Sequence, residues 1–216
     1  MFGLPPIATE ANRMPSSLSL DPAKAVLLVV DMQNDFVLQD APMEVPAARQ
    51  RIPAMAALVA QARAAGVPVI YTQHVLYDEF DVSPLETTQL PHLKTAGMRA
   101  GTPGVEIIAE LAPRPGEVVI PKHRYDAFYN TRLETVIRNI RGRNAVDSVI
   151  ITGTVTSVCC ESTARSAFMR DLRVFFVDDA TGGFDDASHL ATLTTIDRVF
   201  GKVVSTRQVL DALGGA

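Results

Sequence analysis

Short, wholly apolar runs recur along the chain and alternate with longer segments of mixed polarity. The clearest is AVLLVV at residues 25–30, which contains no polar residue. A strand that is buried on both faces of a parallel sheet has such a continuous run, whereas a half-buried strand alternates apolar and polar residues. The pattern predicts strands at 25–30, 67–72, 117–121, 147–152, 173–178 and 202–204.

The segments between these runs carry the spacing of helices. In the first of them Ile52, Met55 and Val59 recur at intervals of three and four residues, and Gly66 and Pro68 mark its end. Strands that alternate with helices predict an α/β fold, with a doubly wound, Rossmann-like sheet of about six parallel strands flanked by helices. The helices are predicted at 47–65, 104–111, 131–141, 157–171 and 187–199.

Two segments fall outside this alternation. Residues 1–20 are rich in proline, serine and small residues, and we expect an extended N-terminal arm there. Residues 73–102 form a long irregular stretch, and loops of that length usually carry function. The chain has no internal repeat and no second alternating series, so residues 21–216 are expected to form a single domain.

The composition is that of an ordinary globular protein. Hydrophobic residues make up 47% and charged residues 20%, which excludes a disordered or fibrous chain. The net charge is −4 and no lysine or arginine cluster stands out, so nucleic-acid and anionic-membrane partners have no electrostatic support. No apolar run approaches the roughly 20 residues of a membrane span, and residues 1–17 lack the pattern of a secretory signal.

The only two cysteines, Cys159 and Cys160, are adjacent. Neighbouring cysteines rarely form a structural disulfide, so a disulfide framework is excluded and a reducing cytoplasm fits best. The four histidines are scattered, and the chain has neither a CxxC nor an HExxH motif. A structural zinc site is therefore not expected.

Three of the predicted strands are each followed by a reactive side chain. Asp31 follows the first strand in VVDMQNDF, Lys122 follows the third in VVIPKHRYDAF, and Cys159 follows the fourth in TGTVTSVCCESTAR. In open parallel sheets, ligands bind beyond the carboxyl ends of the strands. An acid, a cation and a thiol are therefore expected at the same edge of the sheet.

These three groups suit nucleophilic catalysis without a cofactor. A free thiol, with a pKa of ~8.5, is a poor nucleophile at neutral pH, and the start of a helix favours its thiolate. Asp31 can accept the thiol proton and pass it to a leaving amine, while Lys122 keeps Asp31 charged. Backbone N–H groups of the 154–159 turn can form an oxyanion hole. On a helix Cys159 and Cys160 point about 100° apart, and this reasoning does not choose between them.

The segments VVDMQNDF, PKHRYDAF and TGTVTSVCCESTARSA resemble the three signature segments of isochorismatase-like cysteine hydrolases. The resemblance spans roughly residues 22–205 and implies a Rossmann-like sheet of about six parallel strands. Position by position, it implies that Asp31, Lys122 and Cys159 are the catalytic residues, with Cys159 as the nucleophile.

The same resemblance implies the geometry of an oxyanion hole and an oligomeric state. A cis peptide bond would fall between Thr154 and Val155, and the donors would be the backbone N–H groups of Val155 and Cys159. Proteins of this family often form dimers or tetramers, so a homo-oligomer is expected.

The chain departs from some members of this family at particular residues, and these departures reduce the number of activities that the resemblance implies. Nicotinamidases, which resemble this chain, carry an Asp-x-His metal motif that is missing from YTQHVLYDEFDVSP, so no metal is expected. True isochorismatases cleave an enol ether and lack the cysteine, so Cys159 favours acyl chemistry on a C–N bond. The Lys-x-x-Tyr segment, AFYNTRLE and the CxESTxR continuation resemble ureidoacrylate amidohydrolases and biuret-type amidases. That likeness implies substrate-binding roles for Phe36, Gln73, His74 and Tyr125.

We therefore predict a cysteine-dependent amidohydrolase for a small amide or ureido substrate, with an acyl-enzyme on Cys159 and release of ammonia or carbamate. The alternatives are an isochorismatase-type or nicotinamidase-type hydrolase, a non-catalytic binding protein on the same fold, or a thiol redox protein. Taken singly, Asp31 is typical of a turn, Lys122 of a solvated surface, and each cysteine of a core. Only their convergence favours catalysis.

Overall fold

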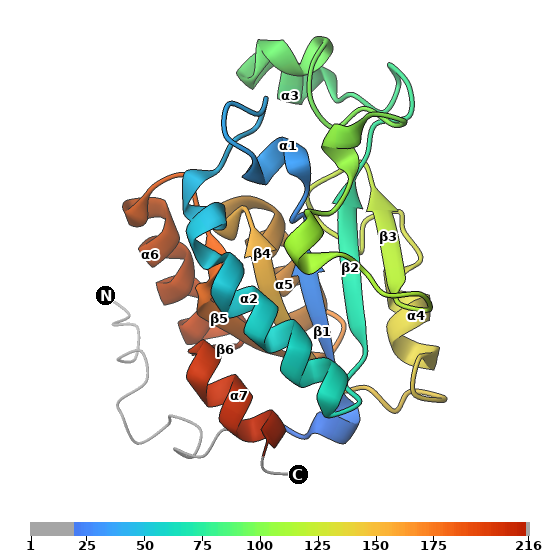
Figure 1. Ribbon diagram of the computed structural model, residues 1–216, viewed down its shortest axis with the longest axis vertical. Coiled ribbons are helices and arrows are strands. Elements are labelled where there is room, and N and C mark those ends of the chain that lie inside the picture. Colours follow the sequence, from blue (N-terminus) through green and yellow to red (C-terminus); the bar gives the residue numbers. More distant parts are fainter. Residues whose placement is uncertain (1–19, 215–216) are drawn as a thin grey trace, which may run out of the picture.

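The computed structural model describes residues 20–214 of the chain (Figure 1). The predicted extended arm lies outside these residues, apart from Leu20, which is buried. The first element is a 3-10 helix, Pro22–Lys24, whose preceding residue Asp21 accepts a hydrogen bond from the backbone N–H of Ala23. Among the described residues, no helix is both long and apolar enough to cross a membrane.

All strands of the described chain run parallel in one sheet, in the order β3-β2-β1-β4-β5-β6. This arrangement confirms the predicted doubly wound, six-stranded fold. The chain winds outward from β1 to β3, then returns to place β4 on the other side of β1, so the switch in winding lies between β1 and β4. The strands are β1 (Ala25–Val30), β2 (Val69–His74), β3 (Val118–Lys122), β4 (Ser148–Thr154), β5 (Arg173–Gly182) and β6 (Lys202–Val204).

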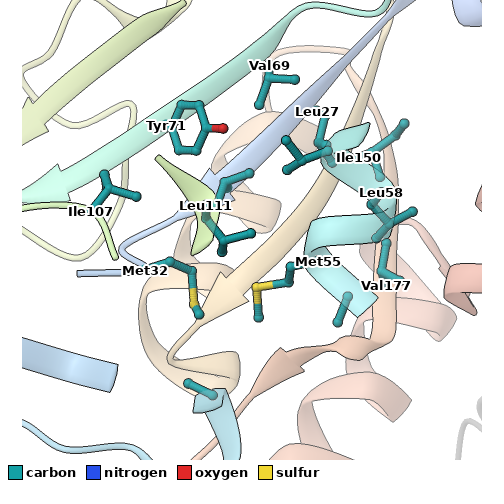
Figure 2. Close-up of a cluster of buried hydrophobic side chains, with 14 of the residues drawn as sticks. Leu27, Met32, Met55, Leu58, Val69, Tyr71, Ile107, Leu111, Ile150 and Val177 are labelled. Atoms are coloured by element: carbon teal, nitrogen blue, oxygen red, sulfur yellow. The ribbon is translucent and has the colours of Figure 1, made fainter. Parts of the chain in front are cut away.

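Strand β1 contributes to a core on each face of the sheet, which explains its unbroken apolar sequence. Leu27 and Val29 belong to one core, and Val26 and Leu28 to the other. Successive side chains of a strand point to opposite faces, so a central parallel strand needs apolar residues at every position. Figure 2 shows part of the first core, in which Leu27 lies with Ile150 of β4 and with Leu58.

Helices cover both faces of the sheet (Figure 1). On the first face α2 (Pro46–Ala64) packs against β5 and against α7 (Thr206–Gly214). On the second face buried residues come from α4 (Leu133–Asn139) and α5 (Glu161–Phe168), together with Ile196 after α6 (Asp186–Thr195). The predicted helices at 47–65, 131–141 and 187–199 are therefore present with shifted ends. Helix α7 was not predicted.

Strands β1 and β4 approach each other closely at the switch in winding. Gly153 pairs with Val30 in the register of the two strands and has a φ angle of 116°. A Cβ atom at position 153 would lie 2.1 Å from the carbonyl oxygen of Val30. Only glycine fits this position without moving one of the two strands.

The predicted helix at 104–111 is wrong. The structure has two 3-10 helices there, Pro103–Val105 and Ala109–Leu111, and the residues between them bond to the loop after β1. The N–H of Asn34 donates to the carbonyl of Glu106, and the N–H of Ile108 donates to that of Met32. Because these backbone groups pair with a distant segment, they do not form the hydrogen bonds of a helix.

Residues 75–102, which we call the cap segment, lie beyond the carboxyl ends of the strands (Figure 1). The segment contains a short helix, α3 (Pro84–Gln89), and a 3-10 helix, Pro91–Lys94. Both lie within the stretch that was predicted to be irregular. A further short helix, α1 (Asn34–Val37), follows β1 on the same side of the sheet.

Candidate active site

The first and third strands bring Asp31 and Lys122 into direct contact at the carboxyl edge of the sheet. Lys122 Nζ lies 2.6 Å from Asp31 Oδ2, and both side chains are completely buried. The hydroxyl of Thr72, on the strand between them, donates to Asp31 Oδ1 at 2.6 Å and accepts from the Asp31 N–H at 3.1 Å. Lys122 Nζ also donates to the carbonyl of Arg124 at 3.0 Å. Each oxygen of the Asp31 carboxylate therefore has a partner.

The backbone of Asp31 adopts an uncommon conformation. Its φ angle is 48°, in the left-handed region that residues other than glycine rarely occupy. Such a conformation persists only where the surrounding contacts hold it, and here Thr72 and Lys122 provide them. The turn at Asp31 redirects the chain at the end of β1 while the carboxylate stays over the sheet edge.

The ion pair keeps Lys122 protonated although it is buried. Burial alone would lower the pKa of Lys122, but the neighbouring Asp31 and Cys159 raise it by more, and the net shift is upward. A buried charge is tolerated where it is paired and hydrogen-bonded. Lys122 is thus a permanent cation beside the carboxylate and the thiol.

Cys159 lies in a π-helical turn, Thr156–Cys160, which joins β4 to α5. Its side chain is 2% exposed, and burial raises the pKa of the Cys159 thiol to about 12. Lys122 and the N–H of Val155 lower this pKa and Asp31 raises it, but burial is the largest effect. The expectation that a helix start would favour the thiolate at rest is therefore wrong, and the resting group is a thiol.

The two adjacent cysteines have different surroundings. The sulfur of Cys159, a carboxylate oxygen of Asp31 and a ring nitrogen of His74 all lie within 4.8 Å of one another. Cys160 is fully buried in the second core, and burial raises its pKa well above the ordinary value. The structure thus places Cys159 beside the acid and leaves Cys160 among apolar side chains.

The peptide bond between Thr154 and Val155 is cis, at the position that the resemblance implies. The N–H of Val155 faces the Cys159 sulfur and lowers its pKa. The hydroxyl of Thr154 donates to the carbonyl of Gly182 at the end of β5. The backbone that carries the expected oxyanion donors is therefore tied to the neighbouring strand.

Strand β2 separates the residues with expected substrate-binding roles, because its side chains alternate between the two faces. His74 is 1% exposed and shares the face of Thr72, beside Asp31 and Cys159. The neighbouring Gln73 donates from Nε2 to the carbonyl of Val105, at 2.8 Å.

The other two expected substrate-binding residues also have distinct positions. Tyr125, in the loop after β3, has its ring centroid 6.2 Å from that of His74 in an edge-on arrangement. Phe36, in α1, is buried in the first core. His74 and Tyr125 therefore lie at the thiol, while Phe36 and Gln73 contact the surrounding structure.

His74 is a neutral imidazole at physiological pH. Burial is the main reason that its pKa lies well below the ordinary value, and Lys122 and Arg124 lower it further. Its backbone is clamped by Gln33, whose amide accepts from the His74 N–H at 2.7 Å and donates to the His74 carbonyl at 3.0 Å. Gln33 thereby fixes the end of β2 relative to the loop that carries Asp31.

The sequence-based reasoning did not identify Thr72. A signal for Thr72 exists, since Thr72 and His74 are polar residues two positions apart in a strand that is otherwise largely apolar. A side chain two positions before His74 must share its face.

The group formed by Asp31, His74 and Cys159 offers a carboxylate, an imidazole and a sulfur, which are ligands that zinc accepts. The ammonium of Lys122, 2.6 Å from the Asp31 carboxylate, opposes a metal cation at this point. The residues that are present fit a proton-transfer site better than a metal centre.

The chain is similar to known proteins along most of its length. The family profile described as the isochorismatase domain matches residues 25–208. A ureidoacrylate amidohydrolase RutB of Klebsiella pneumoniae subsp. pneumoniae is 33% identical, over 94% of this chain and 92% of that protein. A cysteine hydrolase from Pseudomonas syringae pv. phaseolicola aligns with a TM-score of 0.85 at 32% identity, over 92% of this chain and 96% of that one. An N-carbamoylsarcosine amidase from Thermoplasma acidophilum aligns with a TM-score of 0.72 at 28% identity, over 85% of this chain and 96% of that one.

Proposed function

The chain belongs to the isochorismatase family, and from that premise we propose that it is a cysteine-dependent amidohydrolase of a small amide or ureido compound. The observation that carries the proposal is the position of the buried Cys159 thiol beside the Asp31–Lys122 ion pair. The amidohydrolase and amidase names of its relatives support hydrolysis of a C–N bond outside peptides.

In the first half of the proposed reaction, Asp31 takes the proton from the Cys159 thiol as the sulfur attacks the substrate carbonyl carbon. The new C–S bond leaves negative charge on the carbonyl oxygen, and the N–H groups of Val155 and Cys159 stabilise it. When the C–N bond breaks, Asp31 returns its proton to the leaving nitrogen. The departing group is ammonia or an amine, and the acyl group stays on the sulfur.

In the second half, water replaces the amine. Asp31 takes a proton from the water as its oxygen attacks the acyl carbon, and the C–S bond then breaks. The sulfur regains a proton, and the acid is released; from a ureido substrate this acid is a carbamate. Lys122 stays protonated throughout and stabilises the Asp31 carboxylate whenever it is charged.

The high pKa of the thiol fits a mechanism in which ionisation and attack are coupled. With a pKa of about 12, Cys159 is protonated at rest and does not react indiscriminately with electrophiles. A base within 4.8 Å can remove the proton once a substrate carbonyl is in place. We assign His74 and Tyr125 to contacts with the substrate near the thiol, and Phe36 and Gln73 to the pocket wall.

The experiment is ammonia release by the wild type, Cys159→Ala and Cys160→Ala, with ureidoacrylate, biuret, maleamate, N-carbamoyl amino acids and nicotinamide. We expect release by the wild type and by Cys160→Ala, and none by Cys159→Ala. Release by Cys159→Ala at the wild-type rate would contradict the proposal. The best substrate of the series would then define the acyl group.

We also propose that the protein is a cytoplasmic homodimer or homotetramer. Both cysteines are free and buried, which fits a reducing compartment. Light scattering coupled to size-exclusion chromatography measures the mass directly. A mass of 23.3 kDa, that of one chain, at micromolar concentration would contradict the oligomer.

A further inference from the structure

Glu86 of the cap segment is a buried acceptor that the proposed mechanism does not use. Its Oε1 atom has no hydrogen-bond partner within residues 20–214, although the atom is inaccessible to solvent. A buried acceptor without a partner is costly, and native structures keep few of them. A ligand that supplies the missing donor would remove this cost.

The local sequence suggests an ordinary role for Glu86 that the structure does not support. Ser83 is the N-cap of α3 and accepts from the Glu86 N–H, so Ser83 and Glu86 have the spacing of a capping box. In a capping box the glutamate would accept from the Ser83 N–H. Instead its carboxylate faces the Tyr125 hydroxyl, and burial together with this neighbour raises the pKa of Tyr125.

Tyr125 connects Glu86 to the thiol site. One side of Tyr125 meets His74, with ring centroids 6.2 Å apart, and its hydroxyl faces Glu86. His74 lies beside Cys159. The side chain of Tyr125 thus connects Glu86 of the cap segment to His74.

His74 provides a second acceptor without a partner. Its Nε2 atom is buried and has no hydrogen-bond partner in the described part of the chain. The backbone of His123 faces the imidazole and favours a proton on the ring. Because Nε2 has no partner, we assign that proton to Nδ1, which leaves a lone pair on Nε2. Two acceptors without partners therefore lie on either side of Tyr125: the neutral imidazole of His74 beside the thiol, and the carboxylate of Glu86 in the cap segment.

We propose that Glu86 and His74 select the substrate by its N–H donors: His74 binds an N–H next to the scissile carbonyl, and Glu86 binds a carboxamide or ureido N–H at the far end. This inference rests on the proposed function, and it narrows the substrate class. A substrate with a carboxylate at its far end would place two like charges together on the cap side. Uncharged substrates rich in N–H groups, such as biuret-type compounds, fit the pair of acceptors.

The test compares N-carbamoylglycinamide with N-carbamoylglycine, which share the ureido group and differ only in a terminal carboxamide or carboxylate. We expect wild-type kcat/KM to favour the carboxamide by at least about tenfold, since hydrogen bonds to charged groups are the strong ones. In Glu86→Gln this preference should fall by at least about tenfold, mainly through KM. Glu79→Gln removes the same charge from an exposed position of the cap segment and should keep the ratio within about twofold.

A second measurement separates this inference from the catalytic proposal. Calorimetric binding of the two compounds to Cys159→Ala needs no turnover. Tighter binding of the carboxamide that disappears in Cys159→Ala/Glu86→Gln supports the inference even if the wild type hydrolyses neither compound. Equal affinities, tighter binding of the carboxylate, binding of neither compound, or an unchanged ratio in Glu86→Gln would overturn it. Thermal unfolding of Glu86→Gln confirms that the variant is folded.

Discussion

The sheet edge and the cap segment make up the two sides of this site, and their construction differs. At the sheet edge Asp31, Thr72 and Lys122 are buried, and each contacts at least one of the others at 2.6 Å. In the cap segment the large apolar side chains Tyr77, Phe80 and Leu85 are mostly exposed, and Glu86 has a buried atom without a partner. The comparison indicates that buried polar contacts fix Asp31 and Lys122 at the ends of β1 and β3, whereas Glu86, the proposed selective residue of the cap segment, lies among exposed apolar side chains.

The largest loss of stability should come from a variant that breaks the buried ion pair between Asp31 and Lys122. Lys122→Met leaves the Asp31 carboxylate buried without its cation, and we expect a loss of about 3–5 kcal/mol in the free energy of unfolding. Chemical denaturation measures this loss. The double variant Asp31→Asn/Lys122→Met should recover much of the stability but no activity. Equal destabilisation in the single and double variants would show that packing, rather than charge, dominates at the sheet edge.

A substitution where β1 and β4 approach each other closely should cause the next largest loss of stability. Gly153→Ala would place a Cβ atom 2.1 Å from the Val30 carbonyl oxygen, so we expect a loss of about 2–4 kcal/mol. Gly116→Ala is the matched control, because Gly116 also has a positive φ angle, 92°, but has open space around its Cβ position. The control should lose only about 1 kcal/mol from backbone strain. Similar losses in both variants would contradict the steric argument.

The reactivity of the thiol should change steeply with pH. The folded pKa of Cys159 is about 12, above the ~8.5 of an unfolded thiol. Its stabilising contribution is therefore complete below about pH 8.5 and is lost as the pH rises towards 12. In Cys160→Ala, the rate of alkylation by iodoacetamide should rise about tenfold per pH unit between 8 and 10. A plateau near pH 7 would show a pre-formed thiolate.

The smallest effect on stability should come from the cap segment. Ser83→Ala removes the N-cap of α3, which we expect to cost about 0.5–1 kcal/mol locally. The global midpoint of unfolding should change little, while KM for an uncharged ureido substrate should rise as Glu86 loses its position. Hydrogen exchange of residues 84–89 reports the local loss. A large fall in global stability would contradict the contrast between the two sides of the site.

Much of the fold could be predicted because the apolar pattern is itself a consequence of burial. A strand such as β1, covered on both faces, requires an apolar residue at every position, and the interval between strands is long enough for a helix. The segment 104–111 could not be predicted in this way. Its backbone partners are Met32 and Asn34, about 70 residues earlier, and no local pattern records such pairing.

The convergence of Asp31, Lys122 and one of the two adjacent cysteines was predictable from the pattern of strands, because parallel strands deliver their carboxyl ends to one edge. The choice of Cys159 over Cys160 came from the resemblance to the family. Tertiary structure alone decided the rest of the site. It placed His74 beside Cys159, gave Gln73 a partner in Val105 on the opposite face, brought Glu86 to the Tyr125 hydroxyl, and kept Cys159 a thiol at rest. The physical reason is that burial and neighbouring charges set the pKa of a group, while the position of its partners decides whether its hydrogen bonds are satisfied. Burial and partners alike depend on segments that are distant in the chain.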